Sequence, residues 1–265
     1  QEIQTTEFGF GLEGVLRDRA STVTGILNGV DYDEWSPEKD KFIVANYSPA
    51  DLSGKAKCKQ DLLAAFGVSK TDTKLPVIGI VSRFAAQKGF DLISQIMDRL
   101  AREEMIVVAL GSGDKPYEEM FLRLNRQFPQ KIAVKIAYDN TLAHKIEAGS
   151  DMFLMPSRYE PCGLNQIYSL KYGTVPIVRA TGGLDDTIEP WDPRTGKGTG
   201  FKFTEYSGEA LLLTIRQALQ AFRDQNSWQT LMRNGMNKDF SWSASAKEYV
   251  RIYERVRQTR TVSAA

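Results

Sequence analysis

One stretch indicates the fold of this chain more clearly than any other: DMFLMPSRYEPCGL, residues 151–164. Its first part, residues 151–156, reads as a buried strand because apolar residues run together over a strand's length. Its second part brings Glu160 and Gly163 to the point just before a predicted helix at residues 165–172. A carboxylate and a glycine therefore follow the carboxyl end of a strand, which is the edge at which open α/β sheets bind ligands.

Strands and helices alternate on both sides of this stretch. The apolar runs predict strands at residues 75–81, 105–110, 131–136, 151–156 and 175–178. Apolar residues at helical spacing, together with the intervening segments, predict helices at residues 90–100, 118–128, 141–148, 165–172 and 211–222. This alternation indicates an α/β fold: a Rossmann-like parallel sheet with right-handed crossovers and helices on both faces.

The two ends of the chain lack this alternation. Residues 1–24 show no strand pattern, and we expect them to be a tail or linker from a missing N-terminal domain. A Rossmann-like domain is expected over residues 25–240, with a short strand near residues 24–27 and a loop at residues 31–54 rich in turn residues. Residues 241–265 carry an amphipathic pattern and predict a C-terminal helix.

Composition excludes several classes of protein. The net charge is +1 and the basic residues are dispersed, so we expect no electrostatic attraction to nucleic acid or to an anionic membrane. The apolar runs are too short to span a bilayer. Cys58 and Cys162 form neither a disulfide framework nor a zinc-binding spacing. The 42% hydrophobic content supports a sizeable core.

The loop after the first predicted strand carries two cations, Arg83 and Lys88. A planar guanidinium and a compact ammonium at this spacing could grip a diphosphate from two sides. The alternative is a pair of solvated surface charges. The carboxylate of Glu160 favours the first interpretation, because a carboxylate can accept hydrogen bonds from sugar hydroxyls beside the phosphates. Together the three side chains indicate a nucleotide-diphosphate-sugar site.

Three further strand-end loops should meet at the same edge. The run at residues 111–114 resembles the start of a dinucleotide fingerprint, but Pro116 stands where a glycine is needed, so an NAD site is not indicated. Tyr138 could stack on a base or belong to the core. Thr181 and Gly182 follow the last clear strand. The single histidine, His144, lies within a predicted helix, where a structural or surface role is expected, and the sequence shows no metal-ligand cluster.

The order of several motifs identifies a resemblance that covers nearly the whole chain. These motifs are QEIQT at residues 1–5, GILNGVD at 25–31, SRF at 82–84 with QKG at 87–89, PSRYEPCGL at 156–164, YGTVP at 172–176 and RATGGL at 179–184. The chain resembles the C-terminal half of the ADP-glucose-dependent bacterial glycogen synthases and plant starch synthases. The resemblance implies one half of a GT-B fold, in which two Rossmann-like domains flank the active site.

The resemblance also implies roles for individual residues. Arg83 and Lys88 match the pair that binds the donor diphosphate, Glu160 matches the glutamate that contacts the transferred glucose, and Tyr138 matches the adenine-stacking tyrosine. The expected catalytic residues are therefore Glu160, Arg83 and Lys88. The full set expected to bind the nucleotide sugar is Arg83, Lys88, Tyr138, Cys162, Gly163, Leu164, Asn165, Thr181 and Gly182. Position 165, which is Asn165 here, is threonine in many members of the family. Related transferases carry a second glutamate at the position that Tyr168 occupies in this chain.

The activity implied by the resemblance is transfer of glucose from ADP-glucose to an α-1,4-glucan with retention of configuration. No metal and no cofactor is expected. The expected partners are ADP-glucose or ADP, and a glucan acceptor bound through the missing N-terminal domain, on which the C-terminal helix should pack. The expected compartment is a bacterial cytoplasm or a plant plastid. A phosphorylase-like enzyme of related fold and a non-catalytic nucleotide-sugar-binding module stay as alternatives.

Overall fold

The computed structural model describes residues 2–68 and 74–263, and backbone contacts divide the chain into two units. The larger unit spans Asp31–Lys238, and the smaller unit combines Gln1–Val30 with Asp239–Ala265. The larger unit contains every site residue that the motifs predict. The expectation that the C-terminal helix packs on a domain outside this chain stays a prediction.

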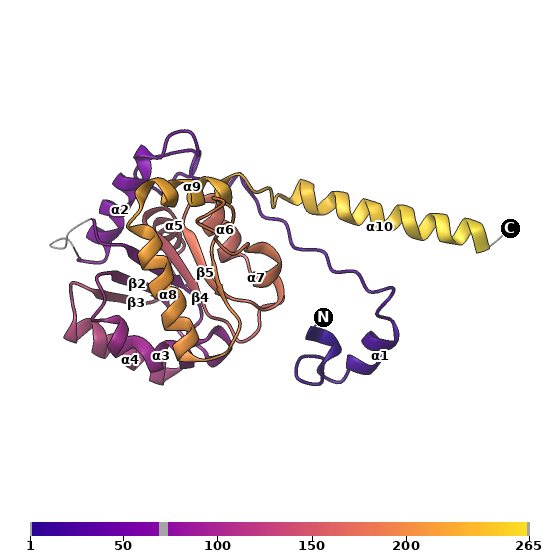
Figure 1. Ribbon diagram of the computed structural model, residues 1–265, viewed down its shortest axis with the longest axis horizontal. Helices are drawn as coiled ribbons and strands as arrows, with labels where there is room; N and C mark the ends of the chain where they lie inside the picture. Colours follow the sequence, from indigo (N-terminus) through magenta and orange to yellow (C-terminus); the bar gives the residue numbers. More distant parts are fainter. Residues whose placement is uncertain (1, 69–73, 264–265) are drawn as a thin grey trace. The chain divides into compact units, whose positions relative to one another are not determined.

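The larger unit is built on a parallel sheet, as predicted. In the described residues the sheet has six strands in the order β3-β2-β1-β4-β5-β6, and every neighbouring pair is parallel (Figure 1). The strands are β1 (Val77–Val81), β2 (Ile106–Gly111), β3 (Ile132–Ile136), β4 (Met152–Met155), β5 (Val175–Arg179) and β6 (Phe201–Phe203). This order is the one that characterises dinucleotide-type Rossmann folds.

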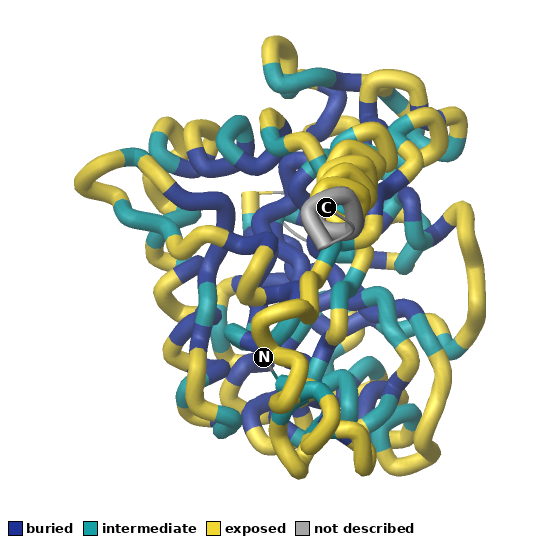
Figure 2. The backbone as a smooth tube through the Cα atoms, turned by 90° about the vertical axis from the view of Figure 1, so that its right-hand side faces the viewer, coloured by how far each residue is buried: buried dark blue, intermediate teal, exposed yellow. Residues whose placement is uncertain are grey.

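Alternation along each strand divides the core between the two faces of the sheet. In β1, Ile78 and Ile80 belong to one buried cluster, whereas Val77 belongs to another. The same division separates Val107 from Ile106 in β2. Because successive strand side chains point to opposite faces, both faces must be covered by helices. Most strand residues are accordingly buried, and Figure 2 draws the buried segments in dark blue.

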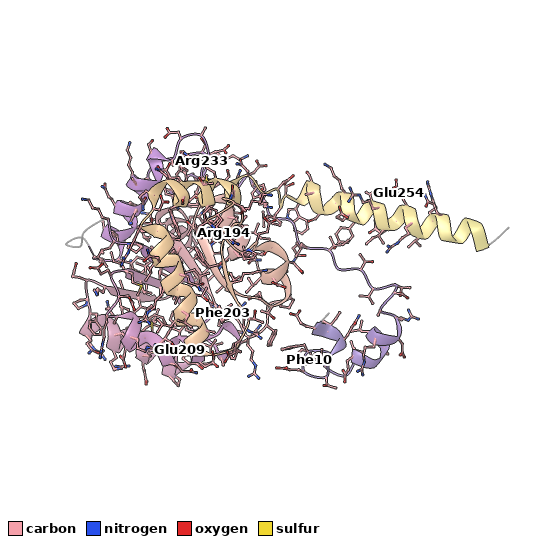
Figure 3. All side chains as sticks on the ribbon, in the orientation of Figure 1. Phe10, Arg194, Phe203, Glu209, Arg233 and Glu254 are labelled. Carbon is pink, nitrogen blue, oxygen red and sulfur yellow. The ribbon has the colours of Figure 1, made fainter. Side chains whose placement is uncertain are left out.

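Helices cover both faces. The first cluster packs beneath α3 (Phe90–Leu100), α4 (Lys115–Gln127) and α8 (Gly208–Phe222), and the second beneath α2 (Ser53–Ala65) and α5 (Asn140–Gly149). Arg99 of α3 donates to Glu209 of α8 at 2.6 Å, and Figure 3 labels Glu209 in the first turn of α8. The remaining helices of this unit are α6 (Asn165–Lys171), α7 (Gly182–Thr187), α9 (Gln225–Met236) and the short η2 (Ala86–Lys88).

Some elements differ from the sequence prediction. The loop expected at residues 31–54 ends early, because α2 begins at Ser53. This helix shows no clear apolar stripe because two of its inward-facing residues are Lys55 and Lys59, both buried. The sequence patterns do not predict α7, β6 and α9 either. The three-residue β6 is too short for a periodic pattern to show.

The smaller unit contains η1 (Glu2–Gln4), α1 (Glu13–Asp18) and α10 (Trp242–Ser263). The strand predicted near residues 24–27 does not form, and only an isolated bridge joins Val30 to Ser241. The Ser245 hydroxyl donates to the Leu27 carbonyl at 2.8 Å. Most of α10 is exposed, as its yellow colour in Figure 2 shows. Over the described residues, no helix has the length and apolar character needed to cross a bilayer.

Candidate functional site

The topology of the sheet determines where a ligand can bind. The chain leaves β1 toward β2 and leaves β4 toward β5, although β1 and β4 are neighbours. Connections that run in opposite directions open a crevice at the carboxyl ends of the two strands. The loop after β1 carries Arg83 and Lys88, and the loop after β4 carries Glu160. The predicted residues therefore meet at the switch point of the sheet.

Aromatic packing holds the loop after β1 in place. Phe84 is fully buried against Phe90 and Phe121, with ring centroids 4.6 Å and 5.3 Å away. Its backbone N–H donates to the Ser112 carbonyl at 2.9 Å. With the Phe84 ring turned inward, the neighbouring Arg83 is left exposed at the surface of the crevice, where its guanidinium donates to the Gln87 side chain at 2.9 Å.

Glycine allows the two loops to approach each other. Gly89 has φ +79°, and a Cβ placed there would lie 2.1 Å from the Pro156 carbonyl oxygen, so a larger residue would force the loops apart. The Arg158 N–H donates to the Gln87 carbonyl at 2.9 Å and joins the loops directly. The position of Lys88 relative to Glu160 is therefore determined by backbone contacts as well as by charge.

Lys88 and Glu160 form an ion pair. The Lys88 Nζ atom lies 2.5 Å from Glu160 Oε2, which also accepts a 3.2 Å hydrogen bond from the Ser157 hydroxyl. The Glu160 side chain is 9% exposed and that of Lys88 is 25% exposed, so water reaches the ammonium more than the carboxylate. The Glu160 carbonyl accepts from the Gly183 N–H at 2.9 Å, a backbone contact that holds the loop without using the carboxylate. Among the described residues, the Glu160 carboxylate bonds to Lys88 and Ser157 and to no helix N-terminus.

Most predicted residues line one pocket of about 220 Å³ at the switch point. Those that do are Arg83, Lys88, Glu160, Gly163, Leu164 and Asn165. Gly163 has φ +70°, a left-handed conformation that glycine adopts without strain and that turns the chain into α6. The Asn165 amide donates to the Val81 carbonyl at 2.8 Å, so this side chain ties the start of α6 to the end of β1.

A second pocket of about 420 Å³ adjoins the first and shares Arg83 and Asn165 with it. Tyr138 lines this pocket and is 95% exposed, which excludes the alternative that it belongs to the core. The loop that carries it leads into α5, where the Asp139 carboxylate accepts from the Leu142 N–H at 2.9 Å. The two pockets together offer a smaller, charged compartment beside a larger one with an exposed aromatic ring.

Three predicted residues line neither pocket. Cys162 is a free, half-buried cysteine, and its carbonyl would lie 2.0 Å from a Cβ at Gly183. Thr181 is buried and precedes α7, which Gly182 begins. The loop with Thr181 and Gly182 thus packs against the Glu160 loop. Their roles in binding the nucleotide sugar stay predictions.

Trp35 and Ser157 line the two pockets, although the sequence motifs assign them no role. The Ser157 hydroxyl donates to Glu160. Because Ser157 belongs to the PSRYEPCGL motif, the sequence could have identified it as a site residue. Trp35 comes from the loop before α2, far from the strand-end motifs. It follows GILNGVD at residues 25–31, and nothing in the local pattern indicates that it reaches this edge.

His144 has a structural role. Its ring is fully buried, its Nδ1 atom lies 2.8 Å from Asp40 Oδ2, and it stacks on Trp35 with a centroid distance of 3.8 Å. Asp40 also accepts from the Tyr172 hydroxyl at 2.6 Å. Burial acts to raise the pKa of Asp40, but hydrogen bonds from the histidine and the tyrosine outweigh it and leave that pKa lowered. Across residues 2–68 and 74–263, no group of His, Cys, Asp and Glu side chains could hold a metal ion.

Comparison with known proteins agrees with this geometry. The family model described as glycosyl transferases group 1 matches residues 64–234. A glycogen synthase of Koribacter versatilis is 71% identical over 98% of this chain and 53% of its own length. A glycogen synthase of Thermosipho africanus is 48% identical over 96% of this chain and 53% of its own. The chain thus spans about half the length of the curated relatives it matches.

Solved structures show the same similarity. The catalytic domain of starch synthase IV from Arabidopsis thaliana, bound to ADP and acarbose, superposes with a TM-score of 0.89 at 34% identity, covering 96% of this chain and 53% of that one. A sucrose-phosphate synthase of Thermosynechococcus elongatus, at 20% identity and a TM-score of 0.62, shares the fold. The predicted half of a GT-B fold is therefore confirmed. The chain belongs to the group 1 glycosyltransferases and is similar to the glycogen and starch synthases.

Proposed function

We propose that this chain is the donor-binding half of a glucosyltransferase that extends an α-1,4-glucan from ADP-glucose. The observation that carries the proposal is the Lys88–Glu160 ion pair, which lies in the switch-point pocket beside the Arg83 guanidinium. Two cations and one carboxylate in a single pocket fit a ligand that is a diphosphate at one end and a sugar at the other. The similarity to glycogen synthases supports glucose as that sugar.

The proposed arrangement of the donor follows from the two pockets. The diphosphate lies between Arg83 and Lys88, near the turn at Gly163, and the glucose lies toward Glu160 in the smaller pocket. The base lies in the larger pocket against the exposed ring of Tyr138. Arg83 lines both pockets, which suits a residue that contacts the diphosphate between base and sugar. The ADP bound to the starch synthase relative supports the same class of nucleotide.

The ion pair gives the proposed reaction a defined starting state. Without donor, Lys88 neutralises Glu160, so neither charge is buried alone. An arriving diphosphate competes for the ammonium, and Glu160 turns to the sugar hydroxyls. As the bond between the anomeric carbon of glucose and the diphosphate breaks, an acceptor hydroxyl bonds to that carbon and its proton passes to the leaving diphosphate. The guanidinium and the ammonium stabilise the negative charge that grows on this diphosphate. The proposed reaction uses no cofactor. The similarity to glycogen synthases supports a glucan as the acceptor, and a bacterial cytoplasm or a plastid stays the expected compartment.

Calorimetry and a glucan-extension assay test the proposal. We expect the 265-residue chain to bind ADP weakly and to transfer almost no glucose, because the relatives carry about as much sequence again. The full product of the gene should transfer glucose from ADP-glucose to a glucan primer. Failure of the full product to do so, with no ADP bound to the chain, would overturn the proposal. A visible absorbance band from bound pyridoxal phosphate would instead indicate a phosphorylase-like enzyme.

A binding module without activity makes a different prediction. In that case ADP-glucose would bind measurably to the full product, yet the rate of primer extension would not exceed that of a control without enzyme. Measuring binding and transfer on the same preparation separates this outcome from loss of the fold. Replacing ADP-glucose with UDP-glucose in both measurements determines the nucleotide preference.

A further inference from the structure

Trp35 contributes a wall to the larger pocket without belonging to any strand-end loop. It is half-buried, and it lines this pocket together with Tyr138 and the residues that follow β1, β2 and β3. The pocket is larger than its neighbour at the switch point, about 420 Å³ against 220 Å³. Trp35 has no part in the core clusters that cover the two faces of the sheet. It packs against a third buried cluster that includes Tyr47 and Tyr172, and from there it also reaches the pocket.

Both faces of the Trp35 ring are occupied. His144 stacks on it at a centroid distance of 3.8 Å with an interplanar angle of 13°, and Tyr168 stacks at 4.0 Å and 7°. The Trp35 ring therefore borders the pocket with its edge, because neither of its faces is open. The edge of an indole is the electropositive side of the ring and carries the N–H donor. Within the part of the chain that the structure describes, this N–H has no hydrogen-bond partner.

The stack is anchored in the interior. Asp40, which is 3% exposed, contacts His144 Nδ1 at 2.8 Å and accepts from the Tyr172 hydroxyl at 2.6 Å. The backbone N–H of Phe42 donates to the same carboxyl group at 2.8 Å, and the Phe42 ring lies 4.7 Å from His144. Since the three stacked rings come from the loop before α2, from α5 and from α6, the indole edge is held by three separate elements.

We propose that Trp35 is a specificity-determining residue of the nucleotide site, and that its indole edge recognises a purine. The inference rests on the function proposed above, which places the base in this pocket. A purine stacked on Tyr138 has ring nitrogens that accept hydrogen bonds, and its second ring extends the base toward the pocket wall. A pyrimidine stacked in the same way stops one ring short of that contact. Sites that hydrogen-bond their ligand discriminate strongly against ligands that cannot reach the donor.

The test compares three ligands on the wild-type chain and on Trp35→Phe. A phenyl ring keeps the stacking between His144 and Tyr168 but removes the N–H and the outer part of the indole. We expect the affinity for ADP to fall on the order of tenfold, as for removal of one hydrogen bond and the packing beside it. The affinities for UDP and for inorganic pyrophosphate should stay unchanged, because Arg83 and Lys88 bind the diphosphate.

A matched substitution controls for the removal of a tryptophan. Trp191→Phe changes a half-buried indole between α7 and β6 that lines neither pocket, and it should leave all three affinities unchanged. If ADP binds the wild type and Trp35→Phe equally well, Trp35 does not recognise the base and the inference is wrong. The proposed function would still stand in that case. Equal losses of affinity for ADP and pyrophosphate would assign Trp35 a structural role only. A wild-type chain that binds neither ligand would overturn both proposals.

Discussion

Two of the lysine–carboxylate pairs in the described residues, Lys59–Asp151 and Lys88–Glu160, differ in their surroundings. At the amino end of β4, Lys59 Nζ lies 2.7 Å from Asp151 Oδ2, with side-chain exposures of 11% and 14%. Lys59 also donates to the Leu75 carbonyl at 2.7 Å, and Asp151 also accepts from the Val77 N–H at 2.8 Å. Each member of this pair thus holds a backbone group as well as its partner.

The pair at the carboxyl ends of the strands is less completely bonded. In the described chain the Lys88 ammonium bonds to Glu160 alone, and the Glu160 carboxylate receives one further hydrogen bond, from Ser157. This pair lines a pocket and leaves donors and acceptors for a ligand. An ion pair whose other hydrogen bonds are made within the protein therefore stabilises the fold. An ion pair that keeps unused donors and acceptors is available to a ligand. Three predictions test this distinction and a fourth concerns two other buried charged groups; they follow in decreasing order of their effect on the protein.

Replacing Glu160 with glutamine should lower the rate of glucose transfer by the full gene product on the order of 10²-fold or more, as expected when an enzyme no longer makes an interaction specific to the transition state. ADP affinity should stay the same or tighten, because Lys88 no longer has a carboxylate that competes with the phosphates. Steady-state assays and calorimetry give the two values. A normal rate would remove Glu160 from the catalytic residues.

Replacing Lys59 with methionine should lower the free energy of unfolding by about 3 kcal/mol, because Asp151 would be left as a buried charge without its partner. Urea denaturation measures this decrease, and calorimetry on the folded protein should show unchanged ADP affinity. The double variant Lys59→Met/Asp151→Asn removes both charges and should recover part of the stability. A decrease well below about 1 kcal/mol for the single variant would contradict the structural role of this pair.

Replacing Arg83 with alanine should weaken ADP binding roughly 10- to 100-fold, the effect of one charge-assisted contact. The free energy of unfolding should change by less than about 0.5 kcal/mol, since the guanidinium is exposed. Lys88→Ala should reduce the affinity similarly but the stability more, because it leaves the 9%-exposed Glu160 side chain without its partner. Equal stability of the two variants would show that the ion pair contributes little to the fold.

The smallest expected effect is the variation of folding stability with pH. Burial raises the pKa of Glu147 to about 8 and lowers the pKa of Lys55 to about 8. Between pH 4.5 and 8 the folded protein binds the Glu147 proton and the unfolded chain does not, so this group makes stability fall as pH rises. Between pH 8 and 10.5 the unfolded chain keeps the Lys55 proton and the folded protein releases it, so stability rises again.

Glu147→Gln isolates the acidic limb of this profile. Glutamine can still accept the 2.7 Å hydrogen bond from Ser169 but does not titrate. Urea denaturation across the pH range should therefore show that the unfolding free energy of the variant, relative to that of the wild type, grows from pH 4.5 to 8. The expected growth is about 1 kcal/mol or more, because one pKa unit corresponds to roughly 1.4 kcal/mol. A difference that does not vary with pH would mean that Glu147 titrates normally.

Most of the sheet could be predicted because its strands have clear local patterns. Five of the six strands consist mostly of apolar residues, and the helices between most of them have apolar spacing on one side. The elements that were missed lack these patterns: α2 turns two lysines inward, and β6 has only three residues. Where local pattern and tertiary environment disagree, the local pattern cannot predict the element.

The site divides in the same way. The amino-acid sequence was enough to bring Arg83, Lys88 and Glu160 to one edge, because all parallel strands end on the same side of their sheet. The packing of the elements was needed to show that Lys88 and not Arg83 pairs with Glu160, that Asn165 ties α6 to β1, and that Trp35 reaches the larger pocket. Periodicity along the chain reports which elements form, whereas contacts between distant side chains depend on how those elements pack. The chemistry of this edge is therefore readable from short motifs, but the partner of each charge is a property of the fold.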